Sequence, residues 1–179
     1  MRARLCILVL VVCCLIFGKI QVRGQNRQIG GVFAFNEMSA TFNYANTKET
    51  SLEFSLNIDM NGVLTGKNIY PGGSVQFIYG FMFAEKTFQD GERIYGIAGP
   101  GVKAGYVKNH HGHYGAMAGL CGKIGLVYDF CVPVSLSVSL VPLFAFHINS
   151  TFDGAARMDL HKYGLGASVF PHISILYRF

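Results

Sequence analysis

Charged residues are scarce in this sequence, tryptophan is absent, and no long amphipathic helical period is present. Asp, Glu, Lys and Arg make up 14% of the 179 residues, whereas hydrophobic residues make up 51%. After residue 24, no apolar run approaches the ~20 residues that a membrane-spanning helix needs. If this chain resides in a membrane, only a closed β-barrel satisfies its backbone N–H and C=O groups there.

The first 24 residues have the pattern of a secretory signal peptide. Arg2 and Arg4 precede an uninterrupted apolar run, Leu5 to Phe17, which is too short to span a bilayer. Small residues before position 25 predict cleavage between Gly24 and Gln25. The mature chain, residues 25–179, is then long enough for one domain.

The basic character of the chain belongs to this signal. Its formal net charge is +5, and four of the 15 basic residues lie before residue 25, with no acidic residue among them. Eleven basic residues therefore remain against ten acidic ones. A net charge of +1 gives no support for nucleic-acid binding, so we expect no nucleic-acid partner.

Only two cysteines remain in the mature chain, Cys121 and Cys131. Ten positions span ~33 Å along an extended strand, whereas a disulfide needs Cα atoms within about 7 Å. The two cysteines can pair only if the chain between them folds back. We predict that Cys121 faces a barrel interior and that Cys131 lies in a turn, and we predict no metal-ligand cysteine set and no cofactor.

The mature chain alternates between apolar and small or polar residues, with the period of two that is typical of β-strands. In residues 51–60, Leu52, Phe54, Leu56, Ile58 and Met60 alternate with Ser51, Glu53, Ser55, Asn57 and Asp59. Asn-Gly, Pro-Gly-Gly and Asp-Gly pairs separate such segments. The pattern predicts eight strands, at residues 27–35, 39–45, 51–60, 74–86, 93–107, 114–129, 132–149 and 163–179.

The last predicted strand, Tyr163 to Phe179, has one wholly apolar face with aromatic ends and one face of small or polar residues. The even-numbered predicted connections are tight, and the odd-numbered ones include the longer residues 61–73 and 150–162, whereas the first, residues 36–38, is shorter than expected. Both termini then lie on the side of the tight turns. This arrangement is typical of outer-membrane barrels. We therefore predict an all-β fold, a single closed antiparallel up-and-down transmembrane β-barrel of eight strands.

Charged residues of the predicted strands lie opposite the apolar rows. In an eight-stranded membrane barrel they face a lumen narrow enough to be filled by side chains, where unpaired charges are costly. We predict a plugged interior with a charge network of Glu53, Asp59, Lys103, Lys123 and Arg178. Alternation alone also fits a secreted soluble barrel with the apolar face inside. The signal peptide and the aromatic strand ends favour the membrane.

The terminal Tyr177-Arg178-Phe179, the alternating Ile173 and Ile175, and the eight-strand pattern together resemble small Gram-negative outer-membrane β-barrels of the OmpA/OmpX-like superfamily. The resemblance covers residues 25–179 at the level of architecture. It implies that Ile173, Ile175, Tyr177 and Phe179 form the signal read by the barrel-assembly machinery. It also implies outer-membrane lipid and lipopolysaccharide as surroundings. The absence of tryptophan and the position of Pro171 depart from this pattern, and Pro171 predicts a local break.

Two histidine-containing patterns are candidate sites. His110, His111 and His113 form an H-H-x-H cluster in a predicted loop, a pattern compatible with metal binding, but a solvated polar loop is the favoured interpretation. His172 and Ser174 resemble the His-x-Ser pair of outer-membrane lipid A deacylases. No acidic residue follows them, and alternation turns both toward the lumen, so we predict an interior pair and no catalytic or metal-binding residue.

The sequence thus predicts a non-enzymatic outer-membrane protein, with a structural or surface-interaction role that its outer loops carry. The alternatives are a membrane-embedded lipid A-modifying hydrolase, a narrow pore, and a secreted soluble barrel that binds an apolar ligand.

Overall fold

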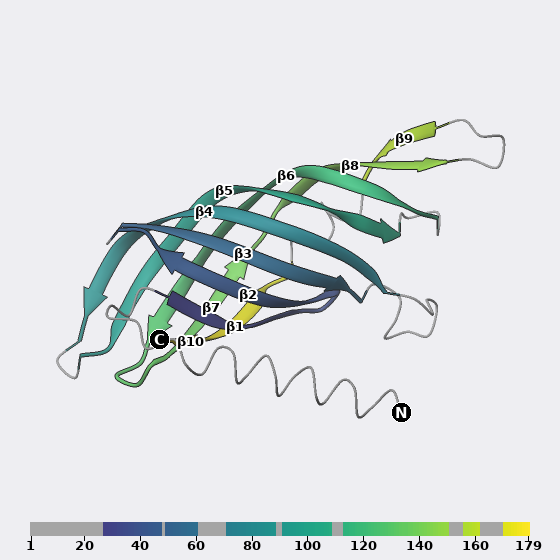
Figure 1. The fold of residues 1–179 in the computed structure, drawn as a ribbon. Helices are drawn as coiled ribbons and strands as arrows, with labels where there is room; N and C mark the ends of the chain where they lie inside the picture. Colours follow the sequence, from purple (N-terminus) through teal and green to yellow (C-terminus); the bar gives the residue numbers. More distant parts are fainter. Residues whose placement is uncertain are drawn as a thin grey trace, which may run out of the picture.

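The computed structural model describes residues 27–47, 49–60, 71–88, 91–108, 113–150, 156–161 and 170–179 (Figure 1). The predicted signal peptide and its cleavage site lie outside these ranges. No helix among the described residues is long and apolar enough to span a membrane. The regular elements are strands: β1 (Arg27–Ala34), β2 (Glu37–Ala45), β3 (Thr50–Asp59), β4 (Gly72–Thr87), β5 (Arg93–Lys108), β6 (Tyr114–Asp129), β7 (Val134–Leu140), β8 (Leu143–Ser150), β9 (Ala156–Leu160) and β10 (His172–Arg178).

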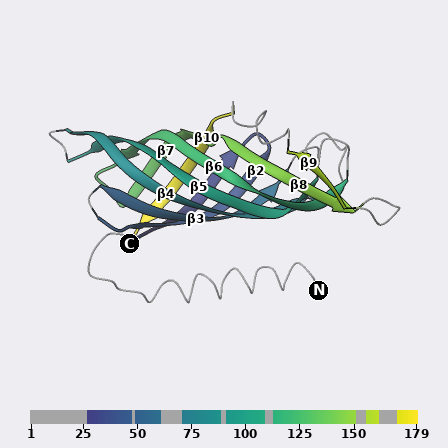
Figure 2. The ribbon, with the colours of Figure 1, turned by 90° about the horizontal axis from the view of Figure 1, so that it is seen from above.

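These strands close into an antiparallel up-and-down barrel of eight wall strands, as predicted. From β1 to β6 each strand pairs with the next one in the chain. β6 pairs with β7 and β8, β7 pairs with β10, and β10 returns to β1. β7 with β8 forms the seventh wall strand, and β9 with β10 supplies the eighth. The strands run obliquely around the barrel, as Figure 2 shows.

The seventh wall strand contains an interruption at Val141 and Pro142 within the predicted strand 132–149. Proline has no N–H to donate to a ladder, so regular pairing stops beside it. The register with β6 nevertheless continues unchanged, from Ile124 opposite Leu140 to Cys121 opposite Leu143. The backbone N–H of Gly122 donates to the Pro142 carbonyl oxygen at 2.9 Å. β7 and β8 therefore form one wall.

The prediction of one continuous final strand from Tyr163 to Phe179 is wrong at Phe170 and Pro171, which lie outside any strand. β10 begins only at His172, directly after Pro171, and β9 lies inside the predicted connection of residues 150–162. His161 donates its backbone N–H to Ala145, and His172 is paired with Ser139. Eleven residue steps from His161 to His172 thus lie opposite only six steps from Ser139 to Ala145. For this reason β9 and β10 do not share one register. Residues 162–169 are outside the described ranges.

The two ends of the barrel differ in their connections. The connections β2–β3, β4–β5 and β6–β7 lie at the end where the chain terminates, which we call the turn end (Figure 1). The opposite end, the loop end, holds β1–β2 and β8–β9, and there β8 and β9 reach past the neighbouring strands. At the loop end Phe35 and Asn36 alone connect β1 to β2, so Glu37 belongs to a strand. The prediction of a connection at residues 36–38 is therefore wrong for Glu37 and Met38.

The barrel closes where β1 meets β10, and this seam has almost no room. A Cβ atom added at Gly30 would lie 1.9 Å from the carbonyl oxygen of Ile175, a distance that no real side chain adopts. Only glycine permits the backbones to approach so closely at this position. The two strands are in register from Gln28 opposite Arg178 to Phe33 opposite Ile173.

Candidate functional site

The outer surface of the barrel is apolar on every side. On β7, Leu136, Val138 and Leu140 point outward and are exposed, and equivalent rows of large hydrophobic side chains cover the other wall strands. Soluble monomers rarely expose contiguous apolar patches beyond a few hundred Å², and larger patches mark contacts with proteins or membranes. A surface of this extent is typical of contacts with proteins or membranes.

The proposed assembly signal lies on this apolar surface. Ile173, Ile175 and Tyr177 alternate with buried residues along β10, and each is about half exposed. Phe179 follows the strand, and its backbone N–H donates to the carbonyl oxygen of Arg27 at 2.9 Å. The four residues thus follow the seam, from Ile173 opposite Phe33 to Phe179 at the turn end.

The interior is polar over a large part of its length. Ser135, Ser137 and Ser139 of β7 are all buried, and they lie on the face opposite the outward hydrophobic row. Hydroxyl and amide groups of the other strands meet in the lumen; for example, Thr41 and Ser55 share a hydrogen bond of 2.8 Å. A polar interior inside an apolar surface is the reverse of a soluble barrel that binds an apolar ligand.

Two buried ion pairs cross this lumen. The ammonium of Lys123 on β6 donates to Glu53 on β3 at 2.5 Å, and Lys103 on β5 donates to Glu37 on β2. All four residues are 9% exposed or less. Each pair joins strands that are three positions apart around the wall, so the pairs brace nearly opposite sides of the barrel. We call them the lumen ion pairs.

A third charged group, the turn-end cluster, surrounds Asp129. Its carboxylate accepts hydrogen bonds from Arg93 at 2.9 Å and from Ser135 at 2.6 Å, and Arg178 lies 3.7 Å away. Gln28 donates to Ser135 at 3.3 Å. The cluster joins β1, β5, β6, β7 and β10, and thus ties the closing seam to the rest of the barrel.

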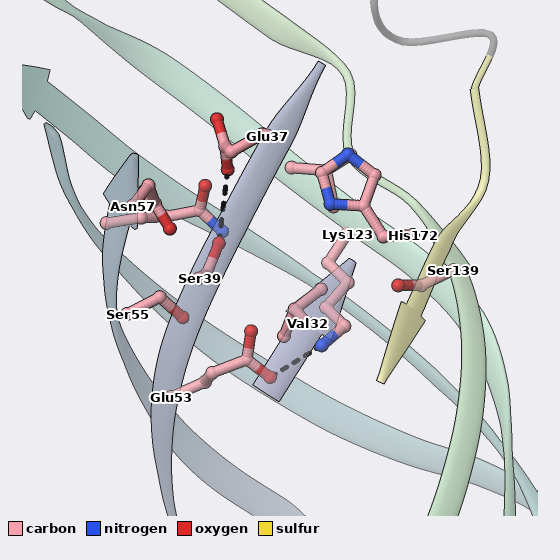
Figure 3. Close-up of a pocket in the computed structure, with 11 residues that line it drawn as sticks. Val32, Glu37, Ser39, Glu53, Ser55, Asn57, Lys123, Ser139 and His172 are labelled. Carbon is pink, nitrogen blue, oxygen red and sulfur yellow. Dashed lines mark hydrogen bonds and ion pairs between the residues drawn. The ribbon is translucent and has the colours of Figure 1, made fainter. Parts of the chain in front are cut away.

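A small cavity, drawn in Figure 3, lies beside Glu37, Glu53 and Lys123 of the lumen ion pairs. Its volume is about 10 Å³, which is room for roughly one water molecule. Glu53 and Lys123 point toward one another across it, and His172 and Ser139 line the opposite side.

The structure places the five residues of the predicted charge network at different levels of the barrel. Glu53, Lys103, Lys123 and Arg178 face the lumen or its turn end. Asp59 lies at the loop end of β3, half-buried, and is paired in register with Glu37 of β2 and Gly72 of β4. The acid that binds Lys103 is Glu37. Glu37 continues the two-residue spacing of Ser39, Thr41 and Asn43. That spacing was the signal in the sequence that could have placed Glu37 on the inner face.

His172 and Ser174, the pair that resembles a hydrolase motif, are both buried and face the lumen. His172 lines the small cavity, on the inner side of the wall from the exposed Ile173. A lipid substrate on the outer surface would have to cross the wall to reach this pair. The geometry thus gives the two residues a packing role.

No three His, Cys, Asp or Glu side chains converge on a metal position among the described residues. His110 and His111 of the loop cluster lie outside those residues, and His113 is exposed. Cys121 is buried, Cys131 is exposed, and neither forms a disulfide.

No protein-family model, curated protein or solved structure matches this chain.

Proposed function

We propose that this chain is an integral outer-membrane β-barrel protein of a Gram-negative bacterium, exported by a cleaved signal peptide and related in architecture to the OmpA/OmpX-like superfamily. The observation that supports the proposal best is the inverted distribution of side chains. Hydrophobic residues cover the outer surface, and ion pairs occupy the interior. Such a barrel satisfies all its backbone groups in lipid and presents only apolar side chains to it.

The role of this protein is structural or surface-interacting, and its outer loops carry it. Its surroundings are outer-membrane lipid and lipopolysaccharide, and the barrel-assembly machinery is its partner during biogenesis. The exposed Ile173, Ile175 and Tyr177 with Phe179 support an assembly signal on β10, because they form one outward row at the seam.

Heat-modifiable migration tests the membrane-barrel proposal. Purified in detergent, the folded protein should migrate faster on a denaturing gel without boiling than after boiling, because a closed barrel resists detergent until it is heated. Cell fractionation should recover the chain in the outer membrane. Recovery in the soluble periplasm without detergent would overturn the proposal.

The protein is neither an enzyme nor a pore in this proposal. The buried position of His172 and Ser174 supports the first statement, and the water-sized cavity supports the second. A His172→Ala variant should leave the lipid A of producing cells unchanged by mass spectrometry. Planar-bilayer recordings should show no single-channel conductance. Altered lipid A modification in the variant, or regular conductance steps, would favour the corresponding alternative.

A further inference from the structure

A buried apolar cluster extends through the lumen toward the loop end. Seven buried residues pack there as one cluster, which we call the loop-end cluster: Ile78, Val107, Met117, Cys121, Val141, Leu143 and Ala145. Two buried histidines, His147 of β8 and His161 just after β9, lie beside it. Neither histidine was singled out from the sequence, and neither has a part in the lumen ion pairs.

His147 has one ring nitrogen held by the backbone and the other directed into the protein. It is 0% exposed, and its Nε2 lies 3.0 Å from the carbonyl oxygen of Val107. A carbonyl only accepts, so Nε2 carries the proton and Nδ1 keeps a lone pair. Nδ1 is buried and has no hydrogen-bond partner. Metal-bound histidines commonly have this arrangement, in which the second nitrogen donates to a carbonyl.

Two further groups with possible donor atoms lie next to His147. Met117 on β6 is directly opposite His147 in the ladder, and both side chains face the interior. Directly opposed residues have Cβ atoms about 4.5–5.5 Å apart, within reach of a thioether. The His161 ring is nearly parallel to that of His147, with centroids 6.1 Å apart. The backbone N–H of His161 is fixed by Ala145 at 2.8 Å.

We propose that Met117, His147 and His161 form a binding site for copper(I). The donors are the Nδ1 atom of His147, the imidazole of His161 and the thioether of Met117. A thioether is a soft ligand that selects Cu(I), and imidazole also suits copper. All three donors are neutral, so they match a monovalent ion better than a divalent one in apolar surroundings.

The other candidate donors nearby fit less well. Cys121 is four residues from Met117 along β6, which is about 13 Å in an extended strand. Asp159 is opposite His147 on β9, but a carboxylate is a hard ligand that suits Mg²⁺, Ca²⁺ or Mn²⁺ better. The site is thus defined by two imidazoles and one thioether.

A Cu(I) titration of the mature chain, residues 25–179, refolded in detergent micelles, tests this site. With ascorbate present and a chromophoric Cu(I) chelator as competitor, the protein should take up one copper per chain. Loss of a supporting outer group typically lowers metal affinity by about 10–100-fold, so His147→Ala, which removes a direct ligand, should lower it by about a hundredfold or more. Equal copper affinity of the parent protein and of His147→Ala would overturn the proposal.

Met117→Leu supplies the variant that keeps the fold, because leucine conserves the volume of methionine. X-ray absorption of the copper-loaded protein should show a sulfur neighbour of the metal, and this signal should be lost in Met117→Leu. The heat-modifiable migration of the variant should stay unchanged. A sulfur signal that persists in Met117→Leu would show that this thioether is not a ligand.

Two control variants separate this site from other copper ligands. Replacement of His110, His111 and His113 by alanine removes the loop histidines, and Cys121→Ser removes the buried thiol. Both should retain one tightly bound copper per chain. Loss of the copper in either control would assign binding to the loop or to the thiol, and would overturn the proposal. The outcome is independent of the membrane location, because the titration needs only the folded barrel.

Discussion

The two faces of β7 differ in polarity, although its seven residues form one continuous strand. Leu136, Val138 and Leu140 point away from the barrel, whereas Ser135, Ser137 and Ser139 are buried within it. The same contrast holds around the wall, where the lumen contains the ion pairs and the outer surface contains the large hydrophobic side chains. The lumen stabilises this barrel by specific polar pairing, and the outer surface contributes only in an apolar solvent.

This contrast teaches that the two faces respond differently to the same kind of change. A buried charge that loses its partner keeps its full desolvation cost. The free-energy cost of a change in an outward side chain depends instead on the solvent around it. The predictions below test the two faces in turn, from the largest expected effect to the smallest.

The lumen ion pair of Lys123 and Glu53 gives the largest expected effect. Lys123→Met leaves the carboxylate of Glu53 buried without its partner, and should lower the free energy of unfolding by about 3–5 kcal/mol. Urea unfolding of the protein in lipid vesicles measures the change. The double variant Lys123→Met with Glu53→Gln should recover part of the loss, because no buried charge remains. A single variant as stable as the parent would show that the pair does not brace the lumen.

The middle of the outer surface gives the next largest effect. Leu120, halfway along β6, is 67% exposed and faces outward. In a bilayer, Leu120→Arg should cost about 2–4 kcal/mol, because arginine is then placed near the midplane. Phe130→Arg in the turn after β6 is the matched control, and should cost about 0–1 kcal/mol at the interface. Equal costs for both variants in vesicle unfolding would contradict the membrane position.

A neutral hydrogen bond in the lumen gives the smallest effect. Thr41→Val removes one partner of the 2.8 Å bond to Ser55 without a large change in shape. The loss should be about 1 kcal/mol, because a buried hydroxyl is left without this bond. Thr41→Val combined with Ser55→Ala should cost less than the two single changes together, in a double-mutant cycle of urea unfolding. Strict additivity would show that the two hydroxyls do not interact.

Alternation grouped many of the lumen residues on one strand face correctly. It failed where a strand begins or ends at another residue than the pattern predicts. Glu53, Lys103 and Lys123 lie in long regular strands, so their face follows from their spacing. Glu37 was missed because a two-residue turn brings it into β2, and turn length is less constrained by pattern than strand face. Phe170 and Pro171 continue the alternation of the final strand, but β10 and its pairing with β7 begin at His172, because proline has no N–H to donate.

The candidate copper site could not be derived from the sequence. Met117, His147 and His161 are far apart in the chain, and none of them belongs to a spaced ligand motif. They meet because the register of β6 with β8 places Met117 opposite His147, and because the β8–β9 pair folds His161 back beside it. Such registers arise only when the wall is assembled.

The sequence by itself determined which side chains share a face of each wall strand, because a strand turns successive residues to opposite sides. It did not determine which of the two faces points into the lumen, since alternation is the same in a barrel with a polar interior and in one with an apolar interior. The direction in which the sheet curves decided that, and placed the charges inside. Closure and register also decided which acid meets which lysine, because Glu37 and Glu53 reach their partners across strands three positions apart.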